Sequence, residues 1–177
     1  MKCLHHGKES PRRRPLEQLA IRRGGLLGAS SVTLVDLPEL EQGLDRPAPV
    51  VAEIEALRVR GYRGSIDLVD DNLIGTSARH IARAKELFRA LAEAKLGKQW
   101  VAQATINFAD DEELLELATK AGCAGVFIGF ESPTPEGLRE CGKKINLVKG
   151  RDFRASVQRI QRHNILVVGS FIIGLDV

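Results

Sequence analysis

The feature that most constrains the fold is an alternation of apolar, strand-like segments with amphipathic helices that begins near residue 50. The strand-like segments are nearly all apolar along their length, which is typical of parallel strands buried on both faces. An unbroken alternation of this kind predicts βαβ units with right-handed crossovers. A rolled barrel and an open doubly wound sheet both fit this pattern. The expected strands are 65–69, 99–106, 125–130 and 165–173.

Helix-period apolar stripes fill the intervals between these strands. Asp110 is the expected N-cap of the third helix, because its carboxylate can accept hydrogen bonds from the free amides of the first turn. Gly122 is expected just past the end of that helix. The expected helices are 50–60, 78–95, 111–121, a short one from about 134 to 141, and 152–162.

Residues 1–49 form a poorly defined N-terminal segment that proline and glycine punctuate. A short helix over 15–22 and a short strand over 31–35 are the only elements expected there. Residues 1–23 carry seven Lys or Arg against two Glu, whereas the rest of the chain is nearly balanced. We therefore predict two parts, 1–49 and an α/β unit over 50–177, and no nucleic-acid partner.

The three cysteines, Cys3, Cys123 and Cys141, are too few and too widely spaced for a disulfide framework or a metal site. Cys123 and Cys141 are interpreted as small buried apolar residues. No apolar run reaches membrane-spanning length, and the N-terminus lacks the apolar stretch of a signal peptide. A cytoplasmic location and no metal ligands are therefore expected.

Polar side chains follow each predicted strand, where α/β proteins bind their ligands. The triplet at 70–72 has an alternative role in capping turn amides. Glu131 follows an apolar run and needs a partner, and Gln103 is expected to point into an interior. Gly174 either allows a ligand to approach the backbone or only relieves packing. The candidate binding residues are Asp70, Asp71, Asn72, Gln103, Glu131, Ser132, Ser170 and Gly174.

Three stretches together resemble the radical S-adenosylmethionine superfamily, in the branch whose members carry an N-terminal cobalamin-binding domain. They are RGYRGSIDLVDDNLIG from Arg60, QATINFADDEELLELATKAGCAGVFIGFESPTPEGLREC from Gln103, and RDFRASVQRIQRHNILVVGSFIIGLD from Arg151. The resemblance implies an incomplete TIM-like (β/α) barrel of four to five parallel strands with outer helices. It also implies S-adenosylmethionine and a 4Fe-4S cluster as cofactors, whose reaction yields a 5′-deoxyadenosyl radical.

Carried over from the family, 70–72 face the methionine moiety, Gln103 lines the cavity, Glu131 and Ser132 lie near the ribose, and Ser170 to Gly174 lie near the adenine. The cluster-binding CxxxCxxC loop is missing, because the matching residues 23–33 contain no cysteine. We therefore expect a fragment or decayed gene product that is inactive alone. The alternatives are a non-redox module that binds S-adenosylmethionine or another nucleotide, and a structural protein whose barrel another chain completes.

Overall fold

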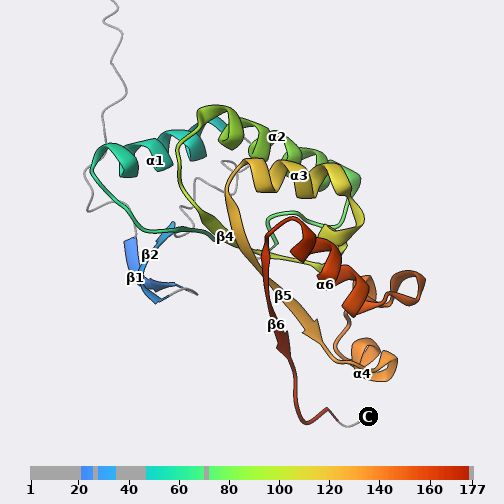
Figure 1. Cartoon of the computed structure of the whole chain (residues 1–177). Helices are drawn as coiled ribbons and strands as arrows, with labels where there is room; N and C mark the ends of the chain where they lie inside the picture. Colours follow the sequence, from blue (N-terminus) through green and yellow to red (C-terminus); the bar gives the residue numbers. More distant parts are fainter. Residues whose placement is uncertain (1–20, 26–27, 35–46, 70–71, 176–177) are drawn as a thin grey trace, which may run out of the picture.

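The computed structural model describes residues 21–25, 28–34, 47–69 and 72–175, which form one sheet with helices packed against it (Figure 1). The sheet has six strands in sequence order: β1 (Ile21–Gly25), β2 (Gly28–Leu34), β3 (Ile66–Leu68), β4 (Trp100–Ala104), β5 (Cys123–Glu131) and β6 (Leu166–Phe171). The β1–β2 pair is antiparallel, and every later pair is parallel. An incomplete (β/α) barrel with outer helices was predicted, and this arrangement confirms that fold class.

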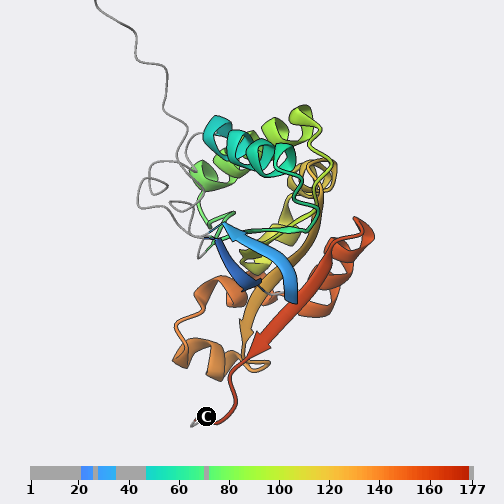
Figure 2. The same ribbon diagram turned by 90° about the vertical axis from the view of Figure 1, so that its left-hand side faces the viewer.

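Helical elements separate the parallel strands, as in βαβ units. They are α1 (Pro47–Val59), α2 (Ala78–Ala94), the 3-10 turn η2 (Ile106–Asp110), α3 (Glu112–Lys120), α4 (Pro135–Glu140), α5 (Lys144–Leu147), the 3-10 turn η3 (Val148–Gly150) and α6 (Phe153–Arg162). Figure 1 shows α1, α2, α3 and α6 gathered on one side of the sheet. In Figure 2, which faces β1 and β2, β5 and β6 run side by side toward the end of the chain.

The core lies between these helices and one face of the sheet. Alternate strand residues such as Ile66, Trp100 and Ile128 are almost fully buried there, against helical residues such as Phe88 and Leu114. The ring centroids of Phe88 and Trp100 lie 5.1 Å apart in a tilted pair, which helps to fix α2 on β4.

Burial of the strands on both faces, the expectation from their apolar composition, holds at Val101 near the start of β4 but fails at the end of β4 and along β6. The opposite, inner face carries Gln103 and Val168, which are exposed, and Leu166, which is 53% exposed. All four long helices lie on the other side of the sheet, and these side chains keep much of their surface exposed. We call the surface that bears Gln103, Phe127, Leu166, Val168 and Ser170 the inner face.

Two local expectations also need correction. Residues 21 and 22 belong to β1 rather than to the expected helix over 15–22, whose other residues lie outside the described part. Asp111, not Asp110, caps α3, because its carboxylate accepts a hydrogen bond from the Leu114 amide at 3.0 Å. The strand expected at 31–35 is confirmed as part of β2 up to residue 34.

Candidate active-site rim

The carboxyl ends of β3 and β4 are tied together by a network of short polar side chains. Asn72 Nδ2 donates to Thr105 Oγ1 at 3.2 Å, and the Thr105 hydroxyl donates in turn to Asn107 Oδ1. Asn107 Nδ2 donates to the Gly75 carbonyl at 2.9 Å, and the Gly75 amide donates to Asn72 Oδ1 at 3.1 Å. These bonds close the loop after β3 and give Asn72 a structural role. Asp70 and Asp71 lie outside the described residues.

Gln103 projects from the inner face of β4. In the parallel register it lies beside Phe127 of β5, which in turn lies beside Val168 of β6. The side chain is exposed and forms no hydrogen bond with any residue in the described part of the chain. A neutral amide therefore stands among apolar neighbours, free to donate to or accept from a ligand.

Glu131 ends β5 in an unusual backbone conformation. Its φ is +65°, in the left-handed region that costs a side-chain-bearing residue about 1–2 kcal/mol. The β5–β6 register shifts between Gly129 and Glu131, which redirects the chain at this point. A Cβ added to Gly129 would lie 2.3 Å from Glu131 Oε1, so the carboxylate folds back over that glycine. Only a glycine leaves room for it there.

A lysine accompanies this carboxylate. Lys143 Nζ lies 3.1 Å from Glu131 Oε1, and the two side chains are 32% and 18% exposed. Gly129 pairs in register with Ser170 of β6, and the Ser170 side chain is half-buried. Glu131 and Lys143 thus pair where β5 and β6 leave the sheet, and Ser170 lies in register beside Gly129. We call Glu131, Lys143 and Ser170 the acidic corner.

Ser132 has a different environment from Glu131. It is buried, and its hydroxyl accepts a hydrogen bond from the Thr134 amide at 3.2 Å and shares another with the Thr134 hydroxyl. Thr134 caps α4 by accepting from the Gly137 amide at 3.2 Å. The structure therefore places Ser132 in the support of a helix start, away from the inner face.

Gly174 lies beyond the end of β6 with φ of +89°. It is exposed, and a Cβ added there would meet nothing within 4 Å among the described residues. A turn requirement thus accounts for this glycine, and the structure does not bring it together with the acidic corner.

Asn146 supports the acidic corner and was not expected from the sequence. Its side chain is only 3% exposed, and Nδ2 donates to the carbonyls of Gly129 at 3.2 Å and Phe130 at 3.0 Å. These bonds fix the two backbone carbonyls that directly precede Glu131 in β5. No pattern in the sequence separates Asn146 from an ordinary polar residue of a short helix, and Lys143 has no distinguishing signal either.

Sequence comparison finds methyltransferases. A 133-residue stretch, 75% of this chain, is 31% identical to a hopanoid C-2 methylase from Rhodopseudomonas palustris. An 83-residue stretch, 47% of this chain, is 39% identical to a bacteriochlorophyllide d C-12(1)-methyltransferase from Chlorobaculum tepidum. The alignments cover 25% and 18% of these proteins, so the chain spans a quarter or less of their length. No protein-family model matches the chain.

Structure comparison finds radical enzymes. The radical S-adenosylmethionine methyltransferase TsrM from Kitasatospora setae, solved with cobalamin and a 4Fe-4S cluster bound, superposes with a TM-score of 0.58 at 23% identity, over 73% of this chain and 26% of that one. The cobalamin-dependent S-adenosylmethionine radical enzyme OxsB gives a TM-score of 0.55 at 18% identity, over 76% and 19% of the two chains. The chain therefore shares the fold of radical S-adenosylmethionine enzymes and is similar in sequence to methyltransferases. The resemblance read from the sequence is thereby confirmed.

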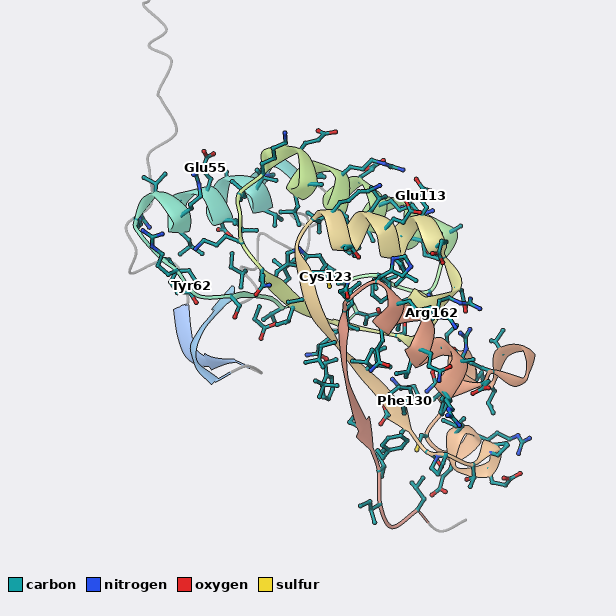
Figure 3. All side chains as sticks on the ribbon, in the orientation of Figure 1. Glu55, Tyr62, Glu113, Cys123, Phe130 and Arg162 are labelled. Atoms are coloured by element: carbon teal, nitrogen blue, oxygen red, sulfur yellow. The ribbon has the colours of Figure 1, made fainter. Side chains whose placement is uncertain are left out.

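A radical S-adenosylmethionine protein normally holds its cluster with three thiolates, and the cysteines here do not fit that task. Figure 3 shows Cys123 at the start of β5, whereas Phe130 marks the other end of the strand, next to the acidic corner. About 25 Å of strand separates Cys123 from Glu131. Burial raises the pKa of the Cys123 thiol to about 12, so a thiolate is disfavoured there.

Cys141 caps the C-terminal end of α4, and Cys3 lies outside the described residues. Within the described part, no three His, Cys, Asp or Glu side chains cluster closely enough to hold a metal ion. The described residues therefore do not fit a 4Fe-4S cluster.

Among the described residues, no helix combines the length and the apolar composition that a membrane span requires.

Proposed function

We propose that this radical S-adenosylmethionine family chain binds S-adenosylmethionine, or a similar nucleoside, at the inner face and does not generate a radical by itself. The observation that carries the proposal is the acidic corner, where Glu131 has a strained, left-handed backbone conformation and its carboxylate folds over Gly129 beside Lys143. Backbone strain of this kind persists where the surrounding structure maintains it, and it concentrates at ligand sites. The proposal places this function in the unit over residues 50–177.

The chemistry of the inner face suits an adenosyl group. A carboxylate accepts hydrogen bonds from the two ribose hydroxyls, and bonds to a charged acceptor are the stronger ones. Phe127 and Val168 lie in one register row with Gln103 and offer apolar surface to a flat base. Gln103 and Ser170 supply neutral donors and acceptors for the ring nitrogens. The relatives found by sequence are methyltransferases by name, and the proteins of similar fold are S-adenosylmethionine enzymes by name.

Isothermal titration calorimetry with S-adenosylmethionine tests the binding step. Glu131→Gln should weaken binding about tenfold or more, because a charged acceptor is lost. Glu136→Gln is the matched control, since Glu136 is exposed on α4 and pairs with Arg139 at 3.1 Å. No heat of binding in protein that circular dichroism shows to be folded would exclude the proposal, as would equal effects of the two variants.

Iron and sulfide analysis after anaerobic reconstitution tests the second part. The expected result is a cluster content far below one per chain, because the described residues present no set of thiolates. A stoichiometric cluster with its broad visible absorption would show that the chain assembles ligands after all. Radical chemistry by this chain would then be the better-supported function.

A second candidate role is a barrel that another chain completes. Strand β6 is an edge of the sheet, and apolar side chains on and beyond it are exposed: Leu166 53%, Phe171 53% and Ile173 96%. An exposed apolar edge is a template for pairing with another strand. Light scattering that shows a folded monomer at every concentration tested would count against this role.

A further inference from the structure

A pocket of about 400 Å³ lies at the opposite end of the sheet from the acidic corner. It opens between the C-terminal ends of α2 and α3, where β3 and β4 begin. Its floor is apolar and includes Ile54, Ile66, Leu91 and Trp100. Trp100 is fixed there, because Nε1 donates to the Ala121 carbonyl at 2.9 Å. A rigid apolar floor of this size suits the body of a small ligand.

Three lysines line the same pocket: Lys95, Lys98 and Lys120. Lys120 lies 3.4 Å from Glu116, but neither Lys95 nor Lys98 forms an ion pair with a carboxylate of the described residues. The pocket therefore combines an apolar floor with an excess of positive charge at its rim. We call it the lysine pocket.

Lys98 shows how little negative charge surrounds this rim. Its ammonium group donates to the Tyr62 carbonyl and lies 5.3 Å from the centroid of the Tyr62 ring. Burial, with Arg63 and Arg58 nearby, lowers the pKa of Lys98 below its ordinary value of 10.5. An anion in the pocket would relieve this repulsion.

The lysines also lie near the C-terminal ends of two helices, where cations complement the carbonyl dipoles. That role needs no apolar floor and no cavity beside it. We propose that the lysine pocket binds a small anionic amphiphile, with its apolar body on the floor and a carboxylate, phosphate or sulfonate group between Lys95, Lys98 and Lys120. This site is separate from the acidic corner and does not depend on the function proposed above.

Trp100 is the only tryptophan of the chain, so any energy transfer to a bound probe starts from the floor of this pocket and is strongest for a probe bound there. The probes are 1-anilinonaphthalene-8-sulfonate and N-phenyl-1-naphthylamine, which share their aromatic body and differ in the sulfonate. The expected result is saturable binding of the sulfonate with energy transfer from Trp100. The neutral probe should bind with an affinity at least about tenfold lower. Equal affinities, or no transfer from Trp100, would overturn the proposal.

The double variant Lys95→Gln/Lys120→Gln removes two of the three charges from exposed positions and leaves the Lys98–Tyr62 contact in place. It should weaken sulfonate binding about threefold or more and leave the neutral probe unaffected. Lys144→Gln, at an exposed lysine on α5, is the matched control and should change neither affinity. Because the sulfonate probe also binds partly unfolded proteins, each variant is first shown to have an unchanged urea midpoint. Unchanged sulfonate binding in the double variant would show that Lys95 and Lys120 only stabilise the helix ends and do not bind the anion, which would overturn the proposal.

Discussion

Arg151 and Asp110 form a two-bond ion pair that joins the segment before α6 to the turn after β4. Nη1 donates to Oδ1 at 2.7 Å and Nη2 donates to Oδ2 at 2.6 Å, although 41 residues separate the two in sequence. The Arg151 side chain is only 7% exposed, and its Nε atom has no partner among the described residues. A buried guanidinium thus depends on one carboxylate.

Removing that carboxylate should destabilise the fold. Asp110→Asn leaves the buried Arg151 charge without its counterion, and the free energy of unfolding should fall by about 1–3 kcal/mol. Urea unfolding followed by circular dichroism measures this. Glu140→Gln, at an exposed glutamate of α4, should stay within about 0.5 kcal/mol of the parent chain. A similar small effect for Asp110→Asn would show that the pair adds nothing to stability.

The charge of Asp111 should make stability depend on pH. Burial acts to raise the pKa of Asp111, but hydrogen bonds from Lys85 and the Leu114 amide outweigh it, and the pKa lies below its ordinary value of 3.8. A carboxyl with a lowered pKa stabilises the fold above its unfolded pKa and loses that effect as the pH falls through the folded one. Stability should therefore decline as the pH falls below about 4.

Asp111→Asn separates this charge effect from helix capping, because Asn also caps well. The variant should be less stable than the parent chain by about 0.5–1 kcal/mol at pH 7, and the two should converge as the pH approaches 3 and below. Thermal unfolding between pH 3 and 7 provides the measurement. A difference that stays constant with pH would assign the loss to the cap rather than to the charge.

Gly129 should matter for binding more than for stability. An alanine there would displace the Glu131 carboxylate, the flexible end of a side chain, which is cheap to move. Gly129→Ala should therefore change the free energy of unfolding by less than about 1 kcal/mol and weaken S-adenosylmethionine binding several-fold. Gly169→Ala is the contrasting variant, because its Cβ would lie 2.5 Å from the Phe130 ring in the core. That variant should cost about 1–3 kcal/mol. The opposite ranking would contradict the assignment of Gly129 to the site.

The two described cysteines should differ in reactivity. Cys123 is buried with its pKa raised to about 12, whereas Cys141 is half-buried. In a Cys3→Ser background at pH 8, a disulfide reagent should modify Cys141 readily and Cys123 only when the chain unfolds, because the thiolate is the reactive form. Rapid modification of both in native protein would show that the start of β5 opens easily.

Much of the fold could be predicted because the signals for it are local. The apolar stripe of α2 predicts a helix over 78–95, within a residue of the observed bounds, Ala78–Ala94. The parallel order follows from the regular alternation of strands with helices. The open inner face could not be predicted, because Leu166 and Val168 have the same composition as strand residues that helices cover. Only the arrangement of the helices decides which face is buried.

The acidic corner was predictable in part. Glu131 stands out because a charge at the end of an apolar strand needs a partner, but the identity of that partner depends on how the chain returns after α4. Lys143 is twelve residues away in sequence and Asn146 fifteen, and nothing local links them to Glu131. The left-handed φ of Glu131 was equally hidden, because glycine is the residue expected there.

The helices cover one face of the sheet only, so the residues that pack the core and the residues that can contact a ligand lie on opposite faces. Substitutions on the helix-facing side of a strand disturb close packing, and each is therefore constrained by stability. On the inner face, Gln103 and Val168 touch few neighbours, so exchanges there have little effect on folding. In a chain built this way, substitutions at these positions can change which ligand is recognised while the free energy of unfolding stays nearly constant.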